Sequence, residues 1–207
     1  MDSPLSRAIA GWIAVTALIS VAGQLAINVA QPEHAGVLSA AWSMAQYFTI
    51  LTNLLVAVIL GGLALNRIPS AGVVAGTLLS IVMVGVVYHV LLAPEVPLQG
   101  ARFWTDLGFH TLTPVATLLW WIGFANKALR LSQVPYWLIW PTGYCAYALA
   151  RGLITGRFAY FFFDIERSGI GFVGGYIAAL VAVFAVTGAL IVGVAKMLDT
   201  GSSAVRI

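Results

Sequence analysis

Apolar residues dominate this chain in long, nearly uninterrupted stretches, and most charged residues lie in the short segments between them. A helix needs about 20 apolar residues to cross the hydrocarbon core of a membrane. The sequence therefore predicts an all-α polytopic membrane protein, in which residues 1–207 form a single domain of six transmembrane helices. The predicted spans are residues 9–29, 41–65, 71–93, 103–124, 135–154 and 170–196.

The composition agrees with a membrane location. Hydrophobic residues make up 61% of the chain and charged residues only 8%, whereas a soluble domain has about 25% charged residues. The net charge of +3 rests on few residues and fits a bias in membrane topology, so we expect no nucleic-acid partner. The lone cysteine, Cys145, excludes an internal disulfide.

The distribution of basic residues predicts the orientation. Lysine and arginine favour the cytoplasmic side of a membrane. With the N-terminus inside, six basic residues flank the spans on the inner side and four on the outer side, which predicts both termini inside. The inner residues are Arg7, Arg67, Lys127, Arg130, Lys196 and Arg206, and the outer residues are Arg102, Arg151, Arg157 and Arg167.

One histidine, His110, falls within the fourth predicted span. An ionisable side chain at membrane depth usually faces a protein interior or a water-filled cavity, which makes His110 a candidate functional residue. At a helical rise of 1.5 Å per residue, Thr49 of the second span and His110 both lie roughly 10 Å below the outer surface. The two side chains can therefore meet near the upper acyl chain of a lipid.

Other polar residues of spans two to five cluster near the same depth. They predict a cavity that opens toward the outer leaflet and suits an amphiphilic lipid substrate. Its candidate lining residues are Asn53, Tyr88, His89, Thr113, Tyr147 and Arg151, with Gln46, Thr52 and Tyr144 beside them.

Thr49 and His110 have the chemistry of a nucleophile and its base, because a neutral imidazole can take the proton of a hydroxyl. Asp106 lies four residues before His110 on the same helical face, so its carboxylate could orient the imidazole. Asp106 could equally form an ion pair with Arg102 or Arg151. Asn53, Tyr88 and Arg151 are alternative oxyanion donors, and the sequence does not choose among them. Neither a nucleophile elbow nor a zinc-helix motif is present in the sequence.

Three segments resemble the androgen-induced-gene family of six-span membrane proteins. Residues 46–51, QYFTIL, are similar to that family's aromatic-Leu/Phe-Thr segment. Residues 107–111, LGFHT, with Pro114, are similar to its His-Gly-Met-His-Thr segment and the proline that follows. Residues 143–144, GY, and 155–162, TGRFAYFF, are similar to its Gly-Tyr and Thr-Gly-x-aromatic-x-Tyr-Pro-Phe segment.

Animal members of that family are threonine hydrolases of esters between a fatty acid and a hydroxy fatty acid. The resemblance implies that Thr49 is the nucleophile and His110 the essential histidine, with Thr52 as the alternative nucleophile. It also implies an intramembrane lipid-ester hydrolase without a cofactor or metal. The composition, rich in alanine, glycine and valine, is typical of a bacterial protein, which predicts the bacterial plasma membrane with the active site toward the outer leaflet.

The chain departs from the family pattern at three positions. Leu107 replaces the first histidine of the second segment, Phe161 replaces the proline of the third, and Asp106 stands where the animal proteins have a neutral amide. A membrane of different lipids also offers different esters. The physiological substrate, the acceptor of the acyl group and the oligomeric state therefore stay open at this point.

Two other functions fit the same residues. His89 and His110 lie at similar depth on neighbouring spans, as the ligands of a b-type haem do, and with Asp106 or His34 they could instead bind zinc. A lipid transporter or lipid-binding protein would also need a polar cavity, but it would catalyse no reaction there.

Overall fold

The computed structural model describes residues 3–93 and 98–204, with side chains described as far as Asp199. Within these ranges the chain forms helices and their connections, and no β-strand. The predicted all-α fold is confirmed. Arg206, one of the basic residues counted on the inner side, lies outside the described residues.

The helices follow one another with short connections. The α-helices are α1 (Pro4–Val29), α2 (Val37–Met44), α3 (Phe48–Ala64), α4 (Ala71–Val87), α5 (Gly100–Leu107), α6 (Thr113–Phe124), α7 (Val134–Trp137), α8 (Ile139–Thr155), α9 (Ile165–Ser168) and α10 (Ile170–Ala204). Two π-helical turns, η1 (Tyr88–Leu92) and η2 (Gly108–Leu112), continue α4 and join α5 to α6. Two 3-10 turns, η3 (Leu131–Gln133) and η4 (Phe161–Phe163), precede α7 and α9.

Four helical segments are long and apolar enough to cross a membrane. They are Pro4–Val29, Ala71–Leu92, Gly100–Phe124 and Ile170–Asp199, and a fifth is obtained if α2 and α3 count as one bent span. Large apolar side chains on α1 and α10 are exposed, among them Trp12, Ile19, Val186 and Leu190. Such faces are consistent with an integral membrane protein, because exposed apolar patches of this extent mark contact with lipid or another partner.

The second predicted span is not one straight helix. Residues 41–65 were expected to be continuous, but α2 ends at Met44 and α3 begins at Phe48, and the two helices meet at a bend of 97°. The break contains neither proline nor glycine, so no local signal marks it. Residues 135–154, the fifth predicted span, are divided between α7 and α8, and α8 has 17 residues.

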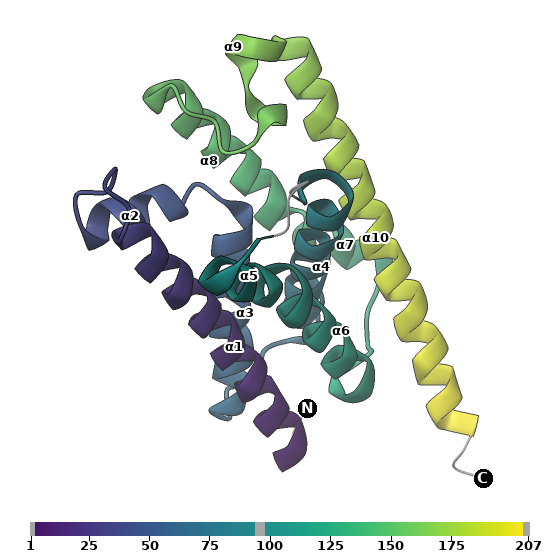
Figure 1. The fold of residues 1–207 in the computed structure, drawn as a ribbon. Coiled ribbons are helices and arrows are strands. Elements are labelled where there is room, and N and C mark those ends of the chain that lie inside the picture. The colour runs from purple at the N-terminus through teal and green to yellow at the C-terminus, as the bar shows by residue number, and fades with distance from the viewer. Residues whose placement is uncertain (1–2, 94–97, 205–207) are drawn as a thin grey trace.

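Helix α1 packs against α3 through small side chains. A Cβ atom added to Gly11 would lie 3.2 Å from the Cβ of Ala64, and one added to Gly61 would lie 3.6 Å from the Cβ of Ala14. Small residues allow helix backbones to approach closely inside a membrane. The α1–α3 pair forms one side of the molecule and α10 lies along the opposite side, with the start of α1 and the end of α10 at the same end (Figure 1).

Helix α1 also holds the segment that carries His110. A Cβ atom on Gly108 of η2 would overlap the Ser20 hydroxyl of α1 and lie 3.1 Å from the Cβ of Ser20. Glycine at 108 is therefore what allows η2 to lie against α1.

We predict that Gly108→Ala lowers the stability of the folded protein by about 1–3 kcal/mol, because the added methyl group overpacks the contact with Ser20. The measurement is thermal unfolding in detergent. Gly123→Ala is the matched control, since no atom lies within 4 Å of a Cβ at that position, and it should leave the melting temperature unchanged or slightly raised. Equal melting temperatures for the two variants would refute the close contact, and Ser20→Ala should partly rescue Gly108→Ala.

Candidate active site

Three side chains of α8 hydrogen-bond to the backbone where α2 gives way to α3. The Tyr144 hydroxyl donates to the carbonyl of Gln46 at 2.6 Å, and the Tyr147 hydroxyl donates to the carbonyl of Ala45 at 3.1 Å. The Arg151 guanidinium donates to the carbonyl of Trp42 at 2.5 Å. These carbonyls have lost the helical donors that would otherwise satisfy them, so α8 supplies the partners that an apolar environment requires.

The break gives Thr49 its position. Tyr47 is extended, α3 starts at Phe48, and Thr49 is the second residue of the helix. The Tyr47 side chain does not cap this helix start, and the first backbone N–H groups of α3, those of Phe48 and Thr49, lie close to the Tyr160 hydroxyl instead. Asn53, one turn later, is fully buried and donates its amide to the Thr49 carbonyl at 2.9 Å.

His110 lies in the π-turn η2, and the turn has an identifiable cause. Pro114 follows four residues later and has no N–H to donate to the His110 carbonyl. The chain widens here, and the Thr113 N–H bonds to the Gly108 carbonyl. Gly85 of α4 lies against the freed His110 carbonyl, since a Cβ there would be 3.0 Å from that oxygen. π-turns within helices are frequent at functional sites.

The Thr49 and His110 side chains meet. The Thr49 Oγ1 lies 3.4 Å from the His110 Nε2, and the His110 Nδ1 lies 3.0 Å from the Asp106 Oδ1. A carboxylate can only accept, so Nδ1 carries the proton, and Nε2 is left with a lone pair facing the threonine hydroxyl. The order hydroxyl, imidazole and carboxylate is that of a nucleophile, its base and an orienting group.

Tyr88, in the other π-turn, η1, contacts both His110 and Asp106. Its ring stacks on the His110 imidazole with centroids 3.6 Å apart and planes 6° from parallel. Its hydroxyl donates to the Asp106 Oδ2 at 2.8 Å. The Asp106 carboxylate thus accepts from Tyr88 on one oxygen and from His110 on the other. Asp106 therefore pairs with His110 rather than with Arg151, whose guanidinium bonds to Tyr147 and Trp42.

A polar cleft of about 500 Å³ opens over the three residues. Thr49, Asp106 and His110 are among its lining residues, which come from several helices and their connections. The exposed fractions of the His110 and Asp106 side chains are 12% and 24%, so both remain accessible to a small reactant. The polar and charged wall residues are Gln24, Asn28, Gln31, Glu33, His34 and Arg102.

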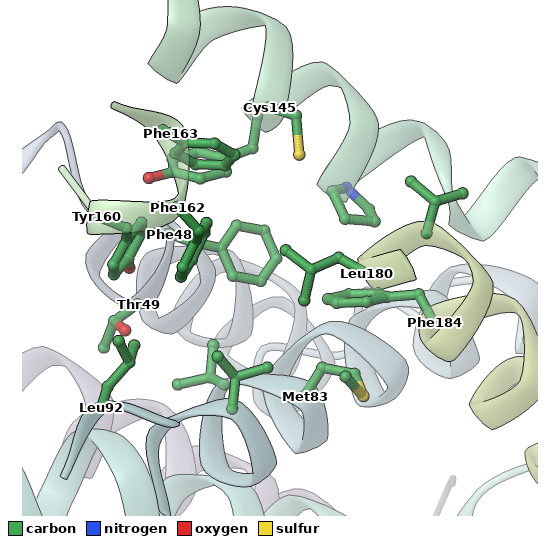
Figure 2. Close-up of a pocket in the computed structure, with 15 residues that line it drawn as sticks. Phe48, Thr49, Met83, Leu92, Cys145, Tyr160, Phe162, Phe163, Leu180 and Phe184 are labelled. Atoms are coloured by element: carbon green, nitrogen blue, oxygen red, sulfur yellow. The ribbon is translucent and has the colours of Figure 1, made fainter. Parts of the chain in front are cut away.

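A second, apolar cavity begins on the other side of Thr49. Its walls come from α3, α4, α8, α10 and the segment around η4 (Figure 2). Thr49 lines both this cavity and the polar cleft, whereas Asp106 and His110 line the cleft and not this cavity. The threonine hydroxyl therefore stands at the junction of a polar and an apolar compartment.

Tyr160 also lines both spaces, although it was not among the predicted site residues. Its hydroxyl lies close to the Thr49 side chain and to the backbone N–H groups of Phe48 and Thr49. Burial raises the pKa of the Tyr160 hydroxyl, so the group keeps its proton at neutral pH and can donate it in a hydrogen bond. The signal for it was present in the TGRFAYFF segment, where the tyrosine belongs to the family pattern.

Other predicted site residues have different surroundings. Thr52 is fully buried and accepts from the Trp140 indole at 3.1 Å, so its hydroxyl is engaged away from His110. Thr113 is also fully buried. His89 faces away from the cleft and lies 3.1 Å from the Thr111 hydroxyl. Tyr147 and Arg151 bond to the backbone of α2 and the break and do not line the cleft.

Within residues 3–93 and 98–204, no group of three histidine, cysteine or acidic side chains is close enough to ligate one ion. Both ring nitrogens of His110 already face protein partners, Asp106 and Thr49.

No protein-family model, curated protein or solved structure matches the chain.

We predict that Tyr144→Phe destabilises the protein by about 1–3 kcal/mol, because it leaves the Gln46 carbonyl buried without a donor. The measurement is again the melting temperature in detergent. Tyr136→Phe is the control, since the Tyr136 side chain is 71% exposed on α7, and it should have no effect. A Tyr144→Phe protein as stable as the control would show that α8 does not hold the break.

Proposed function

We propose that the protein is an intramembrane hydrolase of lipid esters, with Thr49 as the nucleophile and His110 as the base. The observation that carries the proposal is the continuous path from the Thr49 hydroxyl to His110 Nε2 at 3.4 Å and from His110 Nδ1 to Asp106 at 3.0 Å. The hydroxyl becomes nucleophilic when the imidazole removes its proton. Asp106 holds the tautomer that makes this possible and stabilises the imidazolium that forms.

The reaction has two halves. The Thr49 oxygen attacks the ester carbonyl carbon while His110 Nε2 takes the hydroxyl proton, and a tetrahedral oxyanion forms. The carbon–oxygen bond to the alcohol then breaks, and His110 returns the proton to the departing alcohol oxygen. In the second half, His110 takes a proton from water, the resulting hydroxide attacks the acyl-threonine carbonyl, and Thr49 recovers its proton as the fatty acid leaves.

The oxyanion needs donors on the side of Thr49 away from His110. The Tyr160 hydroxyl, which lies close to the Thr49 side chain, and the N–H groups at the start of α3 are the donors nearest to Thr49 that could serve. A helix start carries about half a positive charge, which favours a developing anion, and one such donor contributes about 10²–10³-fold to kcat. This assigns the oxyanion role to Tyr160 and the α3 backbone in place of Asn53, Tyr88 or Arg151.

The proposal extends to the setting of the enzyme. We propose that the chain crosses a bacterial plasma membrane six times, with both termini inside. The site then faces the outer leaflet. The substrate class is fatty-acid esters such as those of hydroxy fatty acids. In its support, the start of α1 and the end of α10 lie at the same end of the molecule (Figure 1).

We predict that purified protein in detergent releases fatty acid from such esters, and that Thr49→Ala lowers kcat by at least about 10³-fold. Thr49→Ser should retain activity, because it keeps the hydroxyl. Thr142→Ala is the matched control, since that hydroxyl only bonds to its own helix. Detergent removes the membrane compartments, so turnover there distinguishes catalysis from lipid transport. Thr49→Ala at wild-type rate would eliminate the threonine nucleophile.

We predict that Asp106→Asn lowers kcat by about 10²–10⁴-fold with little change in KM, because the amide no longer selects the tautomer with Nε2 free. Asp199→Asn is the control, since Asp199 is exposed near the end of α10 and lines neither the cleft nor the apolar cavity. Steady-state kinetics on one ester separate the two parameters. An Asp106→Asn enzyme with wild-type kcat and raised KM would instead place Asp106 in substrate binding.

A further inference from the structure

The apolar cavity beside Thr49 has no role in the proton transfers described above, and its composition is unusual for a void. Its volume is about 60 Å³, which holds roughly four to six water-sized groups and so only a short hydrocarbon segment. Side chains of α3, α4, η1, α8, α10 and the segment around η4 line it, and apart from Thr49 this lining is aliphatic, aromatic or sulfur-containing. Figure 2 shows Thr49 and Tyr160 on one side of the cavity and Leu180 and Phe184 on the opposite side. The cavity thus leads away from the nucleophile toward α10.

The two compartments that meet at Thr49 suit different parts of an ester substrate. The carbonyl carbon must sit against the Thr49 oxygen, with one substituent pointing each way. The polar cleft contains Glu33, His34 and Arg102 along its wall, so it suits the oxygen-bearing alcohol part and admits the water of the second half-reaction. The apolar cavity suits a hydrocarbon, because burying each methylene is favourable and no polar group is left without a partner.

On the side away from Thr49, α10 bounds the cavity where it packs against α3 and α4. Phe184 is buried, and its ring lies 6.1 Å from the ring of Phe48. Thr187, one turn further on α10, lies with its hydroxyl 3.6 Å from the sulfur of Met83. These contacts fix Phe184 and Met83 as a wall, and a wall at a set distance from the nucleophile limits the length of chain that fits.

We propose that this cavity binds the acyl chain of the ester, and that Phe184 with Leu180 sets the longest chain accepted. The inference rests on the proposed function, because it places the ester carbonyl at Thr49. It adds a direction: the acyl chain points toward α10, and the alcohol leaves through the polar cleft.

The first experiment is a chain-length series of nitrophenyl esters, from about four to about sixteen carbons, measured as kcat/KM. A hydrophobic pocket discriminates one methylene by about 10-fold or more. Phe184→Ala should raise kcat/KM for the longest esters by about 10-fold, and Leu180→Phe should lower it by a similar factor, with short esters little changed. Phe172→Ala is the matched control on α10, because Phe172 is exposed and does not line the cavity.

Chain-length profiles that stay the same in both variants, with short esters still hydrolysed, would overturn the inference while the proposed function survives. A protein that hydrolyses no ester would contradict the proposed function. A second experiment then tests separately whether the cavity binds an acyl chain.

The second experiment needs no activity. A short-chain fatty acid with a photoreactive diazirine near its methyl end is crosslinked to the Thr49→Ala protein, and the adducts are mapped by mass spectrometry. Adducts at residues 180–184 and at Met83 are expected. Adducts only on exposed faces such as that of Phe172, or no adduct in the protein, would show that the cavity is a packing void or a site for surrounding lipid.

Discussion

The hydrogen bonds from α8 to the broken α2–α3 segment are the interaction on which the site depends. Inside an apolar environment each unsatisfied backbone group costs several kcal/mol, so a helix cannot break there without replacement partners. Tyr144, Tyr147 and Arg151 supply donors to three carbonyls at the break. They are spaced at i, i+3 and i+7 on one face of α8, which is why one straight helix can satisfy a bent neighbour.

What the break provides is a helix start within the protein. Thr49 stands in the first turn of α3, at the positive end of the helix dipole, where the Tyr160 hydroxyl lies close to the backbone N–H groups of Phe48 and Thr49. The other members of the site also occupy departures from regular α-helix, Tyr88 in η1 and His110 in η2. Three local irregularities on three different segments therefore converge, and each is held by tertiary contacts rather than by its own sequence alone.

Much of this could be predicted from the sequence. The apolar stretches gave the helical class, and their spacing placed Thr49 and His110 at one depth and Asp106 on the same face as His110. The side-chain path from Thr49 through His110 to Asp106 agrees with that expectation. The break at residues 45–47 could not be foreseen, because it contains no proline or glycine and its cause lies about 100 residues away in α8. Because the break was not foreseen, Tyr147 and Arg151 were expected to line the cavity. Their partners are instead backbone carbonyls of α2 and the break. Tyr160 was missed because it lies in a connection, where helical periodicity carries no information.

The most direct test of the account is to locate the nucleophile chemically. The purified protein is treated with a fluorophosphonate, digested, and analysed by mass spectrometry for the modified residue. The account predicts a single phosphonate adduct on Thr49, formed at a rate that falls when His110 is replaced by alanine. An adduct on another hydroxyl, or one on Thr49 that forms equally fast without His110, would contradict it.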